Sequence, residues 1–275
     1  MIKILYHGGC PDGFGSAYAA WKKFGTGEHI EYIACSYESD ILPDIRKGDK
    51  VYIFDFSFDR DTLLGWNDIA DTLVLEDHHI SAQRLLDDLP FTHFDMNHSG
   101  AYLAWRYFHP KDDRPVPLLI EYVEDRDLWK NELPDADAIG LYIYSHEQDF
   151  NTWDDIDVYL TETYWSIVEE GEAIARFRDR LVDIICSSAE YMSMSGLMPI
   201  MVNTPVLQSE VGHRLLQDFP DAPFSGCYST RKDGSTAFSL RSMDDREDVS
   251  KIATDLGGGG HHNASGFIEG KGRRE

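Results

Sequence analysis

The sequence predicts an α/β protein in which a parallel-sheet domain is joined by a helical linker to a smaller α/β domain. Short apolar runs alternate with helical patterns along residues 1–150, which is typical of a parallel sheet with helices on both faces. Several of these runs end in aspartate or histidine, and open α/β sheets bind ligands at the carboxyl ends of their strands. Further strand patterns and a Gly-His segment follow a long helical stretch and indicate the second domain.

Strands of the first domain, residues 1–150, are expected where short apolar runs lie between turn residues. These runs are Ile2–Tyr6, Ile30–Cys35, Val51–Phe56, Thr72–Leu75 and Phe91–Phe94. Helical patterns predict helices at Ser16–Phe24, Arg60–Asp68, Ser81–Leu86, Gly100–Phe108 and Val116–Glu124. The residues between the first strand and the first helix are predicted to form a glycine-rich turn.

A helical linker is predicted at residues 151–192. Apolar side chains recur there every three to four residues between Leu160 and Ile185, so we expect one long helix or a helix pair. The second domain, residues 193–270, is expected to contain strands at Pro199–Asn203, Phe224–Thr230 and Ser235–Arg241 and a helix near Asp248–Asp255. Lys232-Asp233-Gly234 is the predicted tight turn of the hairpin.

The charge of the chain limits its partners. Its 49 acidic and 25 basic residues give a formal charge of −24, which repels the backbone of long DNA or RNA. Arginines or bound metals can still hold a phosphate locally. The four cysteines form no CxxC pair, no signal peptide opens the chain, and no apolar run approaches the ~18 residues of a membrane span. We therefore expect a cytoplasmic protein without membrane contact.

Candidate metal ligands follow three of the predicted strands. His7 and then Asp12 follow the first, Asp55 lies at the end of the third, and Asp77-His78-His79 follows the fourth. Mixed imidazole and carboxylate donors favour manganese, magnesium, iron or zinc, and the lack of thiolate pairs disfavours structural zinc. Two such ions about 3.5–4 Å apart activate water and neutralise phosphate charge in phosphoryl hydrolysis. Asp55 is well placed to be the carboxylate that both ions share.

Each feature also has a structural interpretation. A histidine after a strand is more often a satisfied polar residue than a ligand, and an Asp-His-His segment can be a surface turn. A glycine run is usually a flexible linker. The joint occurrence of these features favours a functional site over three unrelated structural ones.

The chain resembles the DHH phosphoesterases, specifically the subgroup with an appended DHHA1 domain that contains nanoRNases, oligoribonucleases and RecJ-like exonucleases. The resemblance covers most of the chain. In the first domain it rests on four motifs, which are His7–Ser16, Phe54-Asp55, Asp77-His78-His79 and Glu124–Trp129. In the second domain it rests on Ser239–Ser242, Val249–Ala253 and Gly257–Gly266.

The resemblance implies two bound Mn²⁺ ions, with Mg²⁺ or Co²⁺ as substitutes. The implied ligands are His7, Asp12, Asp55, His78 and one of Asp125 and Asp127. Asp55 would bridge the ions, Asp77 would orient an imidazole, and His79 would contact the scissile phosphate. In the second domain the implied substrate contacts are Arg241, Gly258, Gly259, Gly260, His261 and His262.

The first motif departs from the family pattern at Cys10, where the family usually has an aspartate. A thiol is a softer and weaker ligand for manganese than a carboxylate, so the ion near His7 is expected to be weak, absent or of another kind. The alternative is that Cys10 is a small packed residue. The fourth motif offers both Asp125 and Asp127, and the sequence does not distinguish them.

We expect hydrolysis of short single-stranded oligonucleotides or nucleotide phosphates to nucleoside monophosphates, since short chains need few phosphate contacts. The substrate is expected between the two domains. A small-phosphate hydrolase (3′-phosphonucleotide phosphatase, pyrophosphatase or polyphosphatase) and a nucleotide-binding module with a degraded metal site are the alternatives. An aromatic wall formed by Tyr228, Phe238 and Phe267 near Arg241 would favour nucleotides. The sequence is compatible with a homodimer.

Overall fold

Two compact units make up the chain, Met1–Ala175 and Arg176–Glu275. The computed structural model describes residues 1–37, 41–110 and 115–270. The boundary between the units falls inside helix α8 (Tyr164–Cys186), within the segment predicted to be a helical linker. None of the helices in the described ranges combines the length and the apolar character that crossing a membrane requires.

The predicted α/β class is confirmed by the first unit, which contains a five-stranded parallel sheet. Its strands are β1 (Ile2–His7), β2 (Ile30–Cys35), β3 (Lys50–Phe54), β4 (Thr72–Asp77) and β5 (Thr92–Phe94). Their order in the sheet is β2-β1-β3-β4-β5, so the direction of winding reverses between β1 and β3. Sheets of this kind bind ligands at the carboxyl ends of the strands that flank such a reversal.

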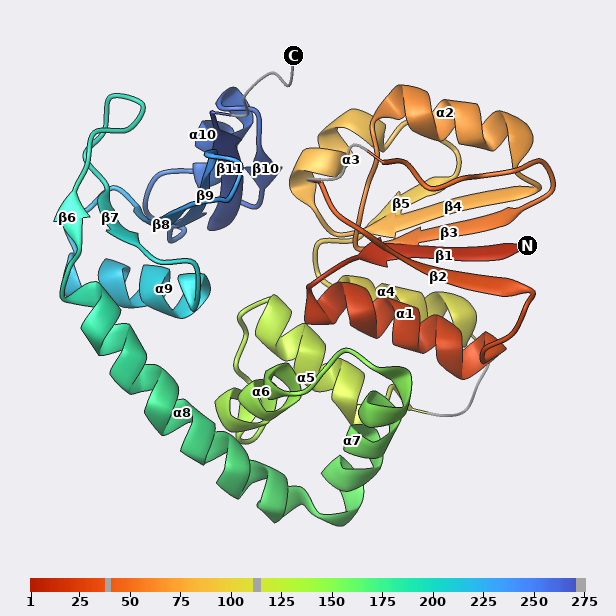
Figure 1. The fold of residues 1–275 in the computed structure, drawn as a ribbon, viewed down its shortest axis with the longest axis horizontal. Coiled ribbons are helices and arrows are strands. Elements are labelled where there is room, and N and C mark those ends of the chain that lie inside the picture. The colour runs from red at the N-terminus through yellow and green to blue at the C-terminus, as the bar shows by residue number, and fades with distance from the viewer. Residues whose placement is uncertain (38–40, 111–114, 271–275) are drawn as a thin grey trace. The chain divides into compact units, whose positions relative to one another are not determined.

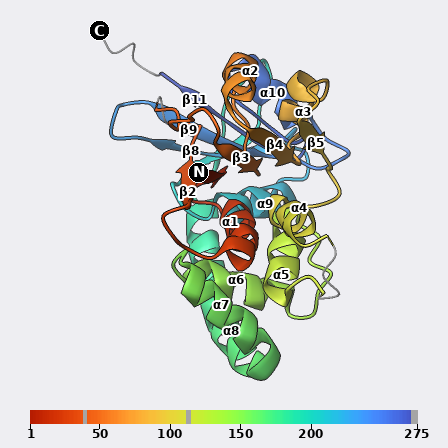
Figure 2. The ribbon, with the colours of Figure 1, turned by 90° about the vertical axis from the view of Figure 1, so that its right-hand side faces the viewer.

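Helices cover both faces of this sheet (Figures 1 and 2). Helices α2 (Arg60–Ile69) and α3 (Ile80–Leu86) lie on one face, and α1 (Pro11–Phe24) and α4 (Gly100–Phe108) lie on the other. Successive strand residues point to opposite faces, so Ile4 belongs to the core beneath α1 and α4 and Leu5 to the core beneath α2 and α3. Both side chains are fully buried.

Three more helices extend the core on the α1 side, namely α5 (Leu118–Asp127), α6 (Ala136–Ser145) and α7 (Phe150–Glu162). Trp153 of α7 is buried and its ring contacts Phe14 of α1, with centroids 4.9 Å apart. Helix α6 was not predicted. Its inner residues from Ala138 to Ile143 are all buried, so it lacks the polar stripe that makes a surface helix recognisable in sequence.

Helix α1 begins at Pro11, so the prediction of a glycine-rich turn up to Ser16 was wrong. Proline at the first helical position suits a helix start because its ring presets the helical φ angle. The glycines of this segment instead allow close packing inside the helix. A Cβ atom on Gly13 would lie 2.1 Å from the carbonyl oxygen of His7, so α1 can lie this close to the end of β1 only with glycine there.

The second unit is built on a mixed six-stranded sheet with the order β10-β11-β9-β8-β7-β6. The strands are β6 (Glu190–Tyr191), β7 (Ile200–Asn203), β8 (Ser225–Thr230), β9 (Thr236–Arg241), β10 (Gly259–Gly260) and β11 (Ala264–Glu269). Helices α9 (Gln208–Asp218) and α10 (Val249–Asp255) pack against opposite faces. The predicted hairpin joins β8 to β9, and its turn contains Gly234 with φ +83°. Helix α9 and strands β6, β10 and β11 were not predicted.

Candidate metal centre

Asp55 lies directly after β3, at the point where the winding of the sheet reverses. Its backbone φ is 54°, in the left-handed region, which costs a non-glycine residue about 1–2 kcal/mol. Its side chain is 1% exposed. Conformational strain of this kind persists where the surrounding structure enforces it, and it is common at functional sites.

The two carboxylate oxygens of Asp55 face different imidazoles. Oδ1 accepts a hydrogen bond of 3.2 Å from Nε2 of His78, and Oδ2 lies 3.6 Å from Nδ1 of His7. His7 and Cys10 flank one side of Asp55, and Asp12, His78 and Asp127 form a cluster on the other. The structure therefore brings together candidate ligands from β1, α1, β3, β4 and α5.

Asp12 holds the start of α4 close to this cluster. Its Oδ2 accepts a hydrogen bond of 2.7 Å from the amide of Gly100, and its Oδ1 accepts one of 3.0 Å from the amide of Ala101. Oδ2 also lies 3.5 Å from Nε2 of His78. The positive end of a helix dipole favours a carboxylate at this position.

Gly100 is a site residue that the sequence analysis missed. A Cβ atom on Gly100 would lie 2.4 Å from Cβ of Asp55 and 2.9 Å from Oδ2 of Asp12. Only glycine therefore allows α4 to approach both carboxylates. The signal in the sequence was a glycine at the predicted start of a helix, directly after Ser99, whose hydroxyl accepts the amide of Tyr102.

Asp127, and not Asp125, lies among the candidate ligands. Oδ2 of Asp127 is 3.6 Å from Nε2 of His78. Asp125 instead accepts a hydrogen bond of 2.9 Å from the amide of Glu132. Side chains two residues apart on a helix point about 200° away from each other. Asp127 can therefore face the cluster while Asp125 supports the loop after α5.

Asp77 orients the imidazole of His79. Its Oδ1 accepts hydrogen bonds from the amides of His78 (2.7 Å) and His79 (3.2 Å) and from Nδ1 of His79 (2.7 Å). The Asp77 side chain is fully buried, which protects these bonds from competing water. Burial opposes the charged ring of His79, but the carboxylate of Asp77 outweighs it and raises the pKa, which favours the imidazolium whose Nε2–H can donate to a phosphate oxygen.

Cys10 lies with the candidate ligands. It is the N-cap residue of α1, its side chain makes no capping hydrogen bond, and it belongs to neither hydrophobic cluster of this unit. Its sulfur lies within 4.8 Å of ligand atoms of His7 and Asp55. Burial, followed by repulsion from Asp55, Asp127 and Asp12, raises the pKa of the thiol well above its ordinary value.

A bound cation would stabilise the negative charge of the clustered carboxylates. Burial and the neighbouring carboxylates raise the pKa of Asp12 well above its usual value and raise that of Asp127. Burial opposes ionisation of Asp55, but the imidazoles of His7 and His78 outweigh it and lower its pKa. Oδ2 of Asp55 is buried and accepts no hydrogen bond from any residue in the described ranges.

Divalent ions fit this donor set. Buried carboxylates without full compensation are unfavourable, and metal ions supply the missing positive charge. Mixed carboxylate and imidazole donors suit manganese and related ions, and Asp55 adjoins both donor groups. The residues present therefore fit a divalent metal, and the side with His7 and Cys10 offers fewer carboxylates than the side with Asp12, His78 and Asp127.

Arg241 is the candidate phosphate contact of the second unit. Its guanidinium donates to the hydroxyls of Ser239 (3.1 Å) and Ser209 (2.7 Å) and to the carbonyl of Leu240 (2.8 Å). These three partners are neutral oxygens that position the group, and the carboxylate of Glu210 also acts on its charge. Burial lowers the pKa of Arg241, which still remains a cation at neutral pH.

The glycine loop differs from the phosphate cradle that we expected. The amides of Gly258 and His261 donate to the carbonyls of Ala253 (2.8 Å) and Ala264 (2.7 Å), so these N–H groups are engaged within the protein. Gly259 and Gly260 form β10 and pair with β11. The segment is thus part of a hairpin in the sheet. Ala264 pairs with Arg241, so the loop and this arginine lie at the same end of the sheet.

His262 and the aromatic residues of the second unit also make structural contacts. Nδ1 of His262 lies 3.7 Å from Asp248, the N-cap residue of α10. Phe238 stacks on Phe267 with centroids 4.6 Å apart, and Phe238 and Tyr228 are partly buried against the core cluster that contains Phe267. Because these rings pack against one another and against the core, they give no argument for nucleotides over small phosphates.

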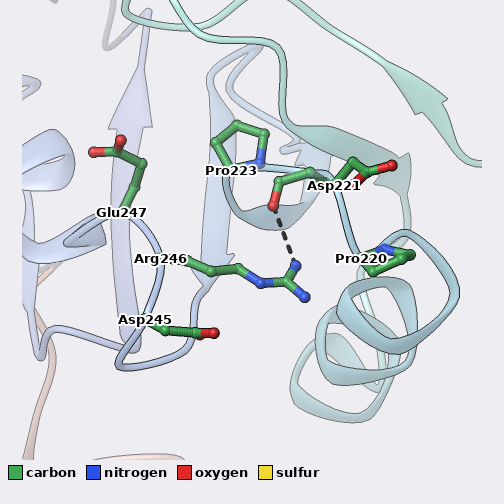
Figure 3. Close-up of a pocket in the computed structure, with 7 residues that line it drawn as sticks. Pro220, Asp221, Pro223, Asp245, Arg246 and Glu247 are labelled. Atoms are coloured by element: carbon green, nitrogen blue, oxygen red, sulfur yellow. Dashed lines mark hydrogen bonds between the residues drawn. The ribbon is translucent and has the colours of Figure 1, made fainter.

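A surface hollow of about 610 Å³ also lies in the second unit, lined by residues 220–223 and 245–247 (Figure 3). Arg246 points into it and donates to the carbonyls of Ala222 (3.1 Å) and Leu216 (3.0 Å), so it satisfies backbone near the end of α9. The remaining charged side chains of the lining are the carboxylates Asp221, Asp245 and Glu247. We interpret the hollow as structural. Its lining cation, Arg246, already donates hydrogen bonds to backbone carbonyls and is not well placed to bind an anion.

Comparison with known proteins adds one sequence relative. The chain is 34% identical over 285 residues to an uncharacterised protein, R106, of Acanthamoeba polyphaga mimivirus. This match covers 96% of the chain, which spans 66% of the relative's length. No family model matches the chain.

Two solved structures share the fold. The pGpG-specific phosphodiesterase PggH from Vibrio cholerae has a TM-score of 0.52 at 12% identity, with 98% of this chain and 93% of that chain covered. RecJ from Thermus thermophilus, in complex with Mn²⁺, has a TM-score of 0.51 at 11% identity, with coverages of 97% and 49%. At these identities the likeness establishes a common fold.

Proposed function

We propose that this chain is a metal-dependent phosphodiesterase of the DHH–DHHA1 type. It hydrolyses short single-stranded oligonucleotides or nucleotide-like phosphates to nucleoside monophosphates. The observation that carries the proposal is the position of Asp55, whose two oxygens face His7 and His78. The fold shared with a phosphodiesterase and with RecJ supports the same class of chemistry.

Two divalent ions, with Mn²⁺ as the first choice and Mg²⁺ or Co²⁺ as substitutes, are the proposed cofactors. His7 and Asp55, with Cys10 beside them, would hold one, and Asp12, Asp55, His78 and Asp127 would hold the other. Ions bound here would supply water activation at neutral pH and neutralise charge on the phosphate.

The protein's own side chains would orient the substrate. His79, fixed by its hydrogen bond to Asp77, is the proposed contact to the scissile phosphate. Arg241 is the proposed phosphate contact of the second unit, because hydrogen bonds to Ser239, Leu240 and Ser209 hold its guanidinium in place. The formal charge of −24 repels long polyanions, and a short substrate needs only a few phosphate contacts. The charge therefore favours short substrates over long polymers.

Digestion of end-labelled RNA and DNA of 2, 5 and 24 nucleotides with added Mn²⁺ tests the proposal. We expect the short substrates to be degraded to monophosphates faster than the long one. Asp55→Asn is the inactive control, because asparagine tolerates the left-handed backbone and removes only the charge. Release of phosphate from pyrophosphate or a 3′-phosphonucleotide, with no cleavage of dinucleotides, would replace the proposal by a small-phosphate hydrolase.

A further inference from the structure

Tyr37 places an aromatic ring at the same sheet edge as the candidate ligands. It follows β2 by two residues, and β2 is the neighbour of β1 in the sheet. The ends of these strands are in register, with His7 opposite Cys35, and the amide of Gly8 donates to the carbonyl of Cys35 (2.7 Å). Tyr37 therefore lies near the end of β1, and its ring reaches residues that follow β3.

The Tyr37 ring has one packed face. It stacks on Phe56 with centroids 4.1 Å apart and an interplanar angle of 26°, and its hydroxyl accepts a hydrogen bond of 3.3 Å from the amide of Ser57. The His7 ring meets it edge-on at 5.7 Å. Tyr37 is nevertheless 56% exposed, whereas Phe56 is 2% exposed. The side of the residue away from Phe56 is the part that a ligand could contact.

The support beneath Tyr37 is rigid. Phe56 contacts Phe58 with centroids 4.9 Å apart, and Phe58 contacts the buried Trp66 of α2 at 4.7 Å. A ring held in place before binding loses little conformational entropy when a ligand stacks on it. A lone exposed aromatic is common on protein surfaces, but this one is fixed beside a proposed metal ligand.

We propose that Tyr37 is a stacking platform for the nucleobase of the nucleotide whose phosphate lies at the metal centre. This inference rests on the proposed function and specifies its substrate class, since an inorganic phosphate has no base to stack. Every nucleobase presents a π face, so such a platform favours nucleotides without selecting a sequence. The first unit would then supply the base contact from the same sheet edge as the candidate metal ligands.

Equilibrium binding of adenosine 5′-monophosphate and ribose 5-phosphate to the full-length protein in Mn²⁺ tests the platform without requiring turnover. We expect the wild type to bind the nucleotide roughly 5- to 150-fold more tightly than the sugar phosphate. Tyr37→Ala should abolish this preference and leave ribose 5-phosphate binding unchanged. Tyr37→Phe should keep the preference, and Tyr37→Leu, which still covers Phe56, should lose it. Tyr159→Ala, at an exposed tyrosine of α7, is the matched control.

The platform is overturned if the wild type binds neither ligand or binds both equally, or if Tyr37→Ala and Tyr37→Leu retain the preference. Equal weakening of both ligands in Tyr37→Leu would also overturn it, because Tyr37 would then only support His7. The proposed function fails separately. If the wild type prefers the nucleotide but cleaves no dinucleotide, the platform is supported and the proposed phosphodiesterase activity is rejected.

Discussion

Cys10 adds a thiol to the candidate ligands of the proposed metal centre. It lies beside His7 and Asp55, and burial together with the carboxylates around it raises the pKa of its thiol. A protonated thiol is a poor ligand, and a thiolate here would need a cation to offset the surrounding negative charge. An aspartate at the same position would be charged at neutral pH and would be a harder donor for Mn²⁺.

Replacing Cys10 by aspartate should therefore lower the manganese concentration needed for half-maximal activity. Cys10→Ser, which offers a neutral oxygen, should need the same concentration or more. Without metal, the additional buried carboxylate should lower the melting temperature through repulsion from Asp55, Asp127 and Asp12. Manganese titrations of activity, run beside thermal melts in a chelator, measure both effects. A lower melting temperature with unchanged manganese dependence would make Cys10 a packed residue.

The pair Asp127 and Asp125 offers a matched comparison of a candidate ligand with its neighbour. Asp127→Asn removes a carboxylate near His78, so we expect the manganese requirement to rise roughly tenfold or more. Asp125→Asn keeps an oxygen that can accept from the amide of Glu132, so it should leave the manganese requirement unchanged. Metal binding by calorimetry checks both variants. The opposite pattern would assign the ligand role to Asp125.

At the scale of elements, the site depends on how closely α4 approaches β3 and α1. Asp12 of α1 accepts the first amides of α4, and Gly100 brings the helix against Asp55. Glu124 of α5 accepts the amide of Ser99 (3.1 Å), so a second carboxylate holds the same helix end. The start of α4 is thus held from two sides, which keeps the carboxylate of Asp12 beside His78.

Gly100→Ala should displace α4 from the metal centre. The added Cβ would overlap Asp55, and overpacking of this kind costs about 1–3 kcal/mol in the free energy of unfolding. Manganese affinity should fall at the same time because Asp12 moves with the helix. Gly65→Ala in α2, where no heavy atom lies within 4 Å of the added Cβ, should stabilise the protein by about 0.5–1 kcal/mol. If Gly100→Ala has the same melting temperature and the same manganese affinity as the wild type, the steric argument is wrong.

At the scale of the whole molecule, the two units offer different chemistry. The first carries the acidic cluster, and the second carries Arg241, held by Ser209 of α9 and by Ser239 and Leu240 of β9. Because the formal charge of −24 repels long polyanions, binding of a phosphate by either unit would depend on such local positive charge.

Arg241→Ala should mainly raise KM, because a contact remote from the metals acts on the ground state and the transition state alike. We expect a change of roughly 30- to 150-fold, as for the loss of a hydrogen bond to a charged group. Steady-state kinetics on a dinucleotide give the split between KM and kcat. Arg246→Ala is the control, since its lost bonds to Leu216 and Ala222 should lower stability without changing KM. A fall in kcat with unchanged KM would instead indicate that Arg241 acts in the chemical step.

Much of the first unit could be predicted from the sequence because its signals are local. The five buried strands appear as short apolar runs, and their parallel arrangement follows from the helices between them. Once the strands are parallel, His7, Asp55 and Asp77 must lie at one edge, since each lies at or directly after the carboxyl end of its strand. The sheet edge and its candidate ligands thus follow from the residue pattern alone.

The rest depended on contacts between residues far apart in the chain. Gly100 is needed because α4 meets Asp12 and Asp55, and Asp127 rather than Asp125 faces His78 because of the rotation of α5 about its axis. Similarly, exposure separates Tyr37 at the sheet edge from Phe267 in a core, although both are aromatic residues in strand-rich segments. Residue types and spacing determine which groups can react, whereas packing determines which of them meet, because the orientation of one helix or strand is set by the surfaces that it buries against others.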